Sequence, residues 1–152
     1  MDNKTKEFTI LIKKTLIISL LSTLLWSETQ SLDLNDFNGN WHLRVMDGKE
    51  VRKARAILDF DATKMQLSGF DGCNQINGVL KGDDQNMSAR LISTRMACRE
   101  PIHAYVSRQL HEAIAQGFSI QKEEKYGIKG IILKSSKHEL FFKRMGKDSG
   151  WF

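Results

Sequence analysis

The 152-residue chain contains one proline and two cysteines, and it has no long uninterrupted apolar run. Because Pro101 is the single proline, a proline-rich linker between domains is excluded, and internal repeats and low-complexity tracts are also missing. No cysteine follows the apolar segment near the N-terminus, which excludes a lipid-modified cysteine that would tether the mature protein to a membrane. The length suits one domain with a core of its own.

The N-terminal segment combines lysines with a short apolar stretch from Thr15 to Trp26. A membrane-spanning helix needs about 20 apolar residues, and Lys13 and Lys14 interrupt the longer stretch that begins at Phe8. This pattern is typical of a secretory signal peptide. We therefore expect residues 1–27 to be a signal peptide, or an uncleaved N-terminal anchor, and residues 28–152 to form the exported domain. The protein is then periplasmic or secreted, and contacts a membrane only if this segment is retained.

The formal net charge of +5 is spread along the chain among acidic residues. Such scattering is typical of a solvated surface, whereas a nucleic-acid groove gathers its lysines and arginines on one face. The charge pattern and the expected export both argue against nucleic acid as a partner.

Apolar residues alternate with polar ones in several short runs, as in half-buried strands. Turn residues separate these runs, for example Asp47-Gly48 and the loop "KGDDQN". The expected strands cover residues 41–45, 54–60, 65–68, 87–91, 118–120, 131–133 and 140–142.

The period changes after Pro101, which occupies the position of a first helical residue. Gly117 follows the last periodic residue as a left-handed stop. An amphipathic helix is therefore predicted over residues 101–116, with an apolar stripe made of Ile102, Val106, Leu110, Ala113 and Ile114. The predicted fold is an α+β, β-rich single domain, with a strongly curved or barrel-like antiparallel sheet and this one helix packed on it.

Cys73 and Cys98 are an even pair in a chain expected to reach an oxidising compartment, which predicts a disulfide between them. Such a bridge contributes on the order of 3 kcal/mol in the chain-entropy estimate. We expect Gly72 to adopt positive φ and the pair at 77–78 to form an Asn-Gly turn, so that the chain bends on both sides of Cys73. Asn74 is expected to hydrogen-bond its own backbone.

The stretches "GCNQINGVL" and "LISTRMAC" together resemble the paired signature of the META domain, the HslJ-like heat-shock protein family of bacterial envelopes. The resemblance runs from about Asp36 to Arg144. It implies a compact β-rich α+β domain, usually exported, associated with heat shock, the stress response and resistance to novobiocin, with no established enzymatic activity. The residues that match the family pattern are Gly72, Cys73, Asn74, Gly78, Ser93, Thr94, Arg95, Met96, Ala97 and Cys98.

These motif residues are interpreted as structural, because short polar side chains satisfy backbone groups and Ala97 allows two segments to approach closely. A polar patch made by Asp71 and Arg95 beside the bridge is the alternative, as a surface that contacts a ligand. Asn86 lies in an Asn-x-Ser sequon with Asp84 two residues before it, so it is a possible glycosylation site.

No catalytic or metal site is predicted. A thiol nucleophile would require reduced cysteines with a base beside them, and nothing in the sequence places His42, His103, His111 or His138 beside either cysteine. His103 and His111 fall on the predicted helix without a third ligand at matching spacing, so a zinc site is not expected. No cofactor is expected either.

We expect a monomeric, non-enzymatic protein that acts by binding an envelope protein or lipid in envelope maintenance or stress tolerance. A carrier of a lipid tail or peptide in a cavity of the β-rich shell, or an inhibitor of a periplasmic enzyme, is the alternative. A thiol-dependent enzyme is the third hypothesis.

Overall fold

The computed structural model describes residues 32–146. The expected signal peptide at 1–27 and the C-terminal tail after 146 lie outside this range. The elements are η1 (Leu34–Phe37), β1 (Gly39–Met46), β2 (Lys49–Glu50), η2 (Arg52–Ala54), β3 (Ile57–Asp61), β4 (Gln66–Phe70), β5 (Gln75–Gly82), β6 (Met87–Ala89), β7 (Ile92–Ser93), α2 (Pro101–Gln116), β8 (Phe118–Lys125), β9 (Ile128–Ser135) and β10 (Glu139–Arg144).

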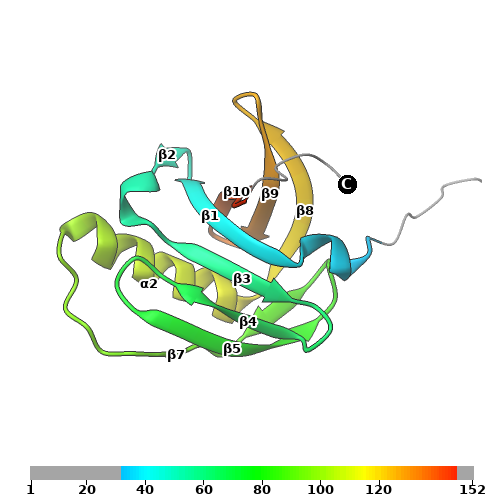
Figure 1. Cartoon of the computed structure of the whole chain (residues 1–152), viewed down its shortest axis with the longest axis horizontal. Coiled ribbons are helices and arrows are strands. Elements are labelled where there is room, and N and C mark those ends of the chain that lie inside the picture. The colour runs from blue at the N-terminus through cyan, green and yellow to red at the C-terminus, as the bar shows by residue number, and fades with distance from the viewer. Residues whose placement is uncertain (1–31, 147–152) are drawn as a thin grey trace, which may run out of the picture. The chain divides into compact units, whose positions relative to one another are not determined.

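The strands form one antiparallel sheet that closes on itself. Its order is β10-β9-β8-β6-β5-β4-β3-β1-β2, β7 pairs with β5, and a further pairing of β10 with β1 completes the ring. The closing register runs from Trp41 opposite Arg144 to Met46 opposite Leu140. The weakest seam lies between β6 and β8, which share the single pair Met87 and Phe118. The predicted barrel-like sheet with one helix is confirmed for the described residues (Figure 1).

Helix α2 follows the predicted pattern. Pro101 opens the helix, and Gly117 ends it with φ of 100°. The predicted stripe faces the core, since Val106, Leu110 and Ile114 are fully buried. The helix lies against the sheet beside the long connection that carries β7 (Figure 1). No helix in the range 32–146 is long and apolar enough to cross a membrane.

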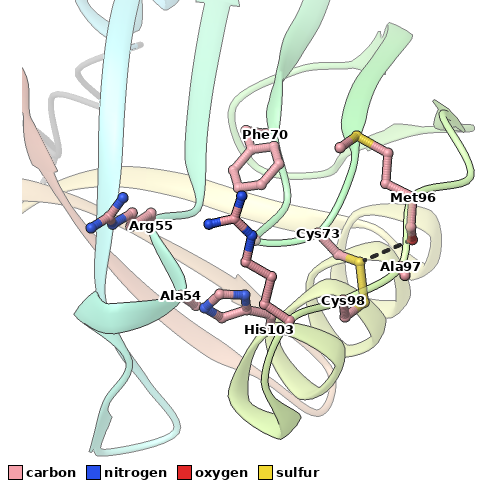
Figure 2. Close-up of a pocket in the computed structure, with 10 residues that line it drawn as sticks. Ala54, Arg55, Phe70, Cys73, Met96, Ala97, Cys98 and His103 are labelled. Atoms are coloured by element: carbon pink, nitrogen blue, oxygen red, sulfur yellow. Dashed lines mark hydrogen bonds between the residues drawn. A yellow bond between two sulfur atoms is a disulfide. The ribbon is translucent and has the colours of Figure 1, made fainter.

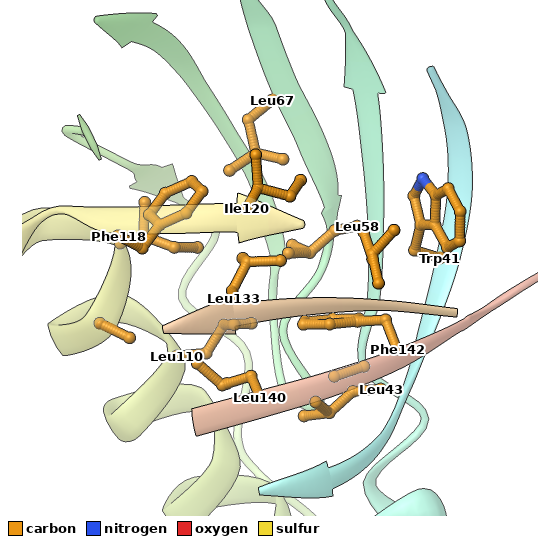
Figure 3. Packing of buried hydrophobic residues seen from close by; sticks show 14 of the residues in the cluster. Trp41, Leu43, Leu58, Leu67, Leu110, Phe118, Ile120, Leu133, Leu140 and Phe142 are labelled. Carbon is orange, nitrogen blue, oxygen red and sulfur yellow. The ribbon is translucent and has the colours of Figure 1, made fainter. Parts of the chain in front are cut away.

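The barrel interior is filled by alternate side chains of its strands and by the apolar face of α2 (Figure 3). Burying one such side chain contributes about 1.5–3 kcal/mol. Trp41 also donates a hydrogen bond from Nε1 to the Phe37 carbonyl at 2.7 Å, which satisfies its polar atom inside the core. The labelled core residues are Trp41, Leu43, Leu58, Leu67, Leu110, Phe118, Ile120, Leu133, Leu140 and Phe142.

Two of the predicted strands begin later than expected because the chain takes left-handed turns there. Ala54 belongs to η2, and Arg55 follows it with φ of 58°, so β3 begins only at Ile57. Met65 has φ of 49° and ends a turn, so β4 begins at Gln66. Alternating polarity does not reveal single left-handed residues of this kind.

The predicted Asn-Gly turn at 77–78 is wrong, because both residues lie within β5. Gly78 serves a different purpose there. A Cβ at this position would approach the Arg90 carbonyl oxygen to 2.9 Å and a Leu91 methyl group to 3.0 Å. The glycine therefore lets the link between β6 and β7 pass close to β5.

Candidate functional site

The Asp71 carboxylate is a buried hub that joins the β4–β5 turn to helix α2. Its Oδ1 atom accepts hydrogen bonds from the backbone N–H groups of Cys73 at 2.8 Å and Asn74 at 2.6 Å. Its Oδ2 atom lies 2.8 Å from Ser107 Oγ and 2.8 Å from His111 Nε2. Burial alone would raise the pKa of Asp71, but the hydrogen bonds, with that of His111 the strongest, outweigh it and hold the pKa below its ordinary value.

Gly72 makes this turn possible. It has φ of +102°, as predicted, and a Cβ there would lie 3.2 Å from the Ala54 carbonyl oxygen and 3.5 Å from that of His103. The turn after β4 is therefore pressed between η2 and the first turn of α2. These three segments, distant in the sequence, are brought together at one end of the barrel.

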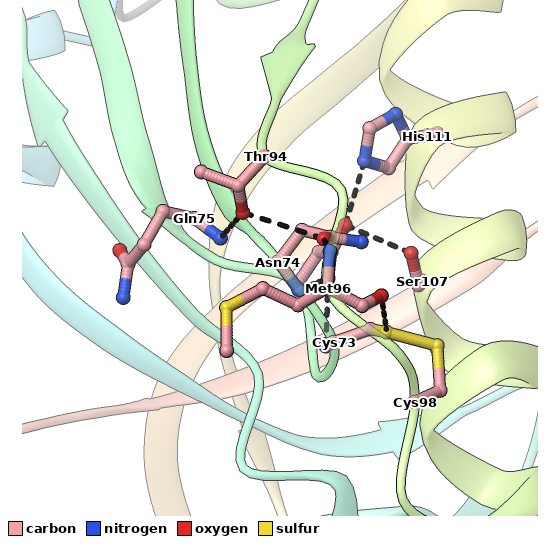
Figure 4. Close-up of a disulfide and its surroundings, with 9 residues drawn as sticks. Cys73, Asn74, Gln75, Thr94, Met96, Cys98, Ser107 and His111 are labelled. Carbon is pink, nitrogen blue, oxygen red and sulfur yellow. Dashed lines mark hydrogen bonds and ion pairs between the residues drawn. A yellow bond between two sulfur atoms is a disulfide. The ribbon is translucent and has the colours of Figure 1, made fainter.

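The Cys73–Cys98 disulfide ties the connection between β7 and α2 to this turn, with a Cα–Cα distance of 5.0 Å (Figure 4). The same connection is held by hydrogen bonds. Gln75 N donates to Thr94 Oγ1 at 3.1 Å, Thr94 N donates to the Gln75 carbonyl at 3.1 Å, and Met96 N donates to Asn74 Oδ1 at 2.7 Å. Asn74 thus bonds the neighbouring segment, and the expected bond to its own backbone is not formed.

We call residues 92–100 the tethered segment. All nine are exposed, including Ile92 at 77% and Met96 at 60%. An exposed segment gains little from core packing, so its conformation depends on the disulfide and on the bonds from Asn74 and Gln75. The result is a fixed surface that displays apolar and basic side chains to solvent.

A pocket of about 250 Å³ lies beside the disulfide (Figure 2). Three basic side chains line it, namely Arg55, Arg99 and His103, and no carboxylate does. The remaining lining comes from Ala54, Phe70, Gly72, Cys73, Met96, Ala97 and Cys98. The pocket thus combines positive charge with an apolar wall.

The predicted polar patch of Asp71 and Arg95 is wrong, since Asp71 is 0% exposed while Arg95 points to solvent in the tethered segment. Of the other motif residues, Ser93 pairs with Ile76 in the sheet. Asn86 is exposed in the β5–β6 loop, and its glycosylation stays a prediction.

Sequence reasoning missed the hub and the pocket. Ser107 and His111 are four positions apart on α2 and so share one face, a signal that was available. Arg55 and Phe70 carried no such signal, because the closed sheet alone brings them beside the cysteines.

The hub does not have the geometry of a nucleophile and its base. Ser107 and His111 both bond the same oxygen of Asp71, and no hydrogen bond joins the two within residues 32–146. The two cysteines are oxidised. In this same range, no group of three or more side chains could hold a metal ion.

Two further spaces bear on the carrier hypothesis. An apolar cavity at one end of the barrel, lined by residues such as Leu34, Phe37 and Ile120, has a volume of about 10 Å³. An acyl chain does not fit there. A groove of about 570 Å³ runs on the outside between β5, the β6–β7 link and α2, and includes Val79 and Ile92.

The comparisons with known proteins bear on this architecture. A solved structure described as "NMR structure of the protein from Burkholderia xenovorans" matches with a TM-score of 0.57 and 22% identity, over 80% of this chain and 96% of that chain. A second, described as "NMR structure of the protein", matches with a TM-score of 0.56 and 24% identity, over 70% of this chain and 89% of that chain. These identities support the fold alone.

The comparison with curated proteins gives no match. The family model of the META domain matches residues 32–146, which is the whole described range and most of the chain. The two cysteine stretches that suggested this family lie within the match. The chain therefore belongs to the META domain family.

Proposed function

We propose that this protein is an exported, non-enzymatic recognition domain of the cell envelope. The observation that carries the proposal is the tethered segment. Its residues are exposed, yet a disulfide and hydrogen bonds at 2.7–3.1 Å fix its backbone. A segment held in one conformation loses less entropy on binding than a flexible loop does, which suits recognition of a partner.

Export is supported by the lysine-flanked apolar stretch before residue 27 and by the disulfide, since stable disulfides are rare in reducing compartments. Intact mass of the protein recovered from the envelope fraction tests this. The expected mass lacks the N-terminal segment and is unchanged by alkylation unless the protein is first reduced. Two alkyl groups added without reduction would contradict both the bridge and the oxidising location.

The non-enzymatic role is supported by the arrangement around Asp71. Its hydrogen bonds hold Ser107 and His111 as donors to one carboxylate, whereas catalysis by a serine needs the histidine to accept the serine proton. We propose heat-shock or other stress tolerance as the setting, on the family resemblance alone.

Site-specific photo-crosslinking in intact cells tests recognition by the tethered segment. A photoreactive phenylalanine replaces Met96, and a matched variant carries it at Tyr126, which is 75% exposed in the turn between β8 and β9. We expect an adduct of defined mass from position 96 and none from position 126. Equal labelling at the two positions, or none at either, would contradict the proposal.

A peptide carrier is the second candidate, favoured by the groove of about 570 Å³ that includes Val79 and Ile92. Val79 is 63% exposed, so the same photoreactive residue is accommodated there. Peptide adducts formed at position 79 in preference to 96 would support the carrier over the first proposal.

A further inference from the structure

The pocket beside the disulfide is built from four separate parts of the chain. The η2 turn contributes Arg55, the end of β4 contributes Phe70, the disulfide closes one side, and the first turn of α2 contributes His103 (Figure 2). The η2 turn and the start of α2 approach the backbone at Gly72, Phe70 is paired on both sides within the sheet, and the covalent bridge fixes the fourth part. The site is therefore formed before any ligand arrives.

The positive charge in this pocket is not neutralised by the rest of the domain. Within residues 32–146, neither Arg55 nor Arg99 forms an ion pair. Two acids close in the sequence to the pocket residues are engaged elsewhere. Glu50 pairs with Arg52 at 2.8 Å, and the Asp71 carboxylate is buried with both oxygens occupied. Two guanidinium groups are thus available to an anion.

Arg55 adopts an energetically unfavourable backbone conformation. Its φ of 58° and ψ of 28° lie in the left-handed region, where glycine or asparagine is more easily accommodated. Strained backbone of this kind is a reason to look for a function of the side chain. Here that side chain lines a pocket that contains a second arginine.

The shape and donors of the pocket select the kind of anion. An arginine fork binds a carboxylate or a phosphate with paired hydrogen bonds. One arginine suffices for a carboxylate, whereas two match the charge and the oxygen count of a phosphate group. The volume of about 250 Å³ suits such a group with a small attached part, which the ring of Phe70 and the Met96 side chain would contact.

We propose that this pocket binds the phosphate group of a phosphoester through Arg55 and Arg99, with His103 as a further donor. This inference rests on the proposed recognition role and names the ligand class of the same surface. The phosphate belongs either to a lipid headgroup or to a soluble phosphoester, and the probes below separate the two sources.

The experiment uses the oxidised exported protein. Amide chemical shifts are followed during titration with inorganic phosphate and with glycerol 3-phosphate. Sedimentation is measured with vesicles of phosphatidylcholine alone and with vesicles that also contain phosphatidic acid. We expect saturable shifts around residues 70–73 and 96–103 with the soluble probes, or sedimentation only with the acidic vesicles. The first result indicates a soluble ester and the second a lipid headgroup.

Three substitutions, each of which removes one positive charge, test the assignment. Arg55→Gln and Arg99→Gln are expected to weaken binding by about tenfold or more, since each removes a charge-assisted pair of hydrogen bonds. Arg108→Gln removes the same charge from an exposed position of α2 outside the pocket and is expected to leave binding unchanged. Equal weakening by all three, or no saturable binding of any probe, would overturn the proposal.

A fourth variant separates binding from folding. Arg55→Gly removes the guanidinium and relieves the left-handed backbone, so we expect Tm to be maintained or raised while binding is lost. Retained binding in this variant would also overturn the phosphate assignment. If photo-crosslinking at Met96 succeeds while all phosphate probes fail, the recognition role stands and only the ligand class is wrong.

Discussion

At the scale of single residues, Asp71 shows how a polar group becomes part of a core. The carboxylate is 0% exposed, and its four donors come from the β4–β5 turn and from α2. Charge-assisted hydrogen bonds are individually stronger than neutral ones. The ionised state is therefore the one that fits the site, and removing the charge should weaken the fold.

Asp71→Asn is expected to lower the free energy of unfolding by about 3 kcal/mol, because the amide replaces one acceptor oxygen with a donor that faces other donors. Urea unfolding at pH 7 measures this. Asp59→Asn, on the outer side of β3, is the matched control and should change stability by less than about 0.5 kcal/mol. A loss no larger than that of the control would contradict the role of Asp71 as a hub.

The pH dependence follows from the same carboxylate. Its folded pKa is depressed, so the unfolded state binds more protons at low pH, and stability falls as the pH drops. The contribution is complete above the unfolded pKa of about 3.9 and disappears as the pH falls through the lower folded value. Urea unfolding at several pH values measures this fall in the free energy of unfolding at low pH, and we expect it to be smaller in Asp71→Asn. If Asp71→Asn loses as much stability at low pH as the unchanged protein, Asp71 is not the source of the pH dependence.

Gly72→Ala tests the crowded turn. It combines strain at φ of +102° with a Cβ placed 3.2 Å from the Ala54 carbonyl oxygen. Gly127→Ala is the control, because Gly127 has φ of +69° with nothing within 4 Å. We expect about 1 kcal/mol of destabilisation for the control and about 2–3 kcal/mol for Gly72→Ala, measured by thermal unfolding. Similar losses in both would mean that the close approach to η2 contributes nothing.

At the scale of elements, the tethered segment depends on contacts that are distant in sequence. Replacing Cys73 and Cys98 together by alanine is expected to cost about 3 kcal/mol, because the bridge closes a 25-residue separation. The fold itself should survive, since the 24-residue apolar cluster includes neither cysteine. Circular dichroism and urea unfolding of the double variant measure both expectations. Loss of the folded state at room temperature would contradict the expectation that the apolar cluster maintains the fold without the bridge.

The elements also show what sequence could predict. Alternation and the stripe on residues 101–116 predicted α2 and seven of the strands, because burial on one face leaves a regular pattern. Strand β5 was instead interpreted as bends around Cys73, and β2 and β7 have only two residues each, too few to show a pattern. Gly78 was wrongly predicted to lie in a turn, because glycine is favoured both in tight turns and where two backbone segments approach closely. Asp71 could not be recognised as buried, since its partners Ser107 and His111 become neighbours only when α2 docks on the β4–β5 turn.

At the scale of the whole molecule, α2 reinforces a barrel that is weakly paired at one seam. Strands β6 and β8 share a single residue pair, and the helix packs against β6. Leu110→Ala, at a fully buried position of the helix, is expected to cost about 3 kcal/mol through lost contact and a residual cavity. Val79→Ala on the outer face of β5 should cost less than about 0.5 kcal/mol. Equal destabilisation by Leu110→Ala and Val79→Ala in thermal unfolding would contradict the packing of α2 on the barrel.

The central claim is that covalent and hydrogen-bonded contacts hold the solvent-exposed tethered segment in one conformation. Backbone amide exchange of the oxidised protein, read residue by residue by NMR, tests it most directly. We expect the amides of Gln75, Thr94 and Met96 to exchange at least about a hundredfold more slowly than in an unfolded chain, because each donates to a fixed acceptor. Exchange of all three at the unfolded rate would contradict the account.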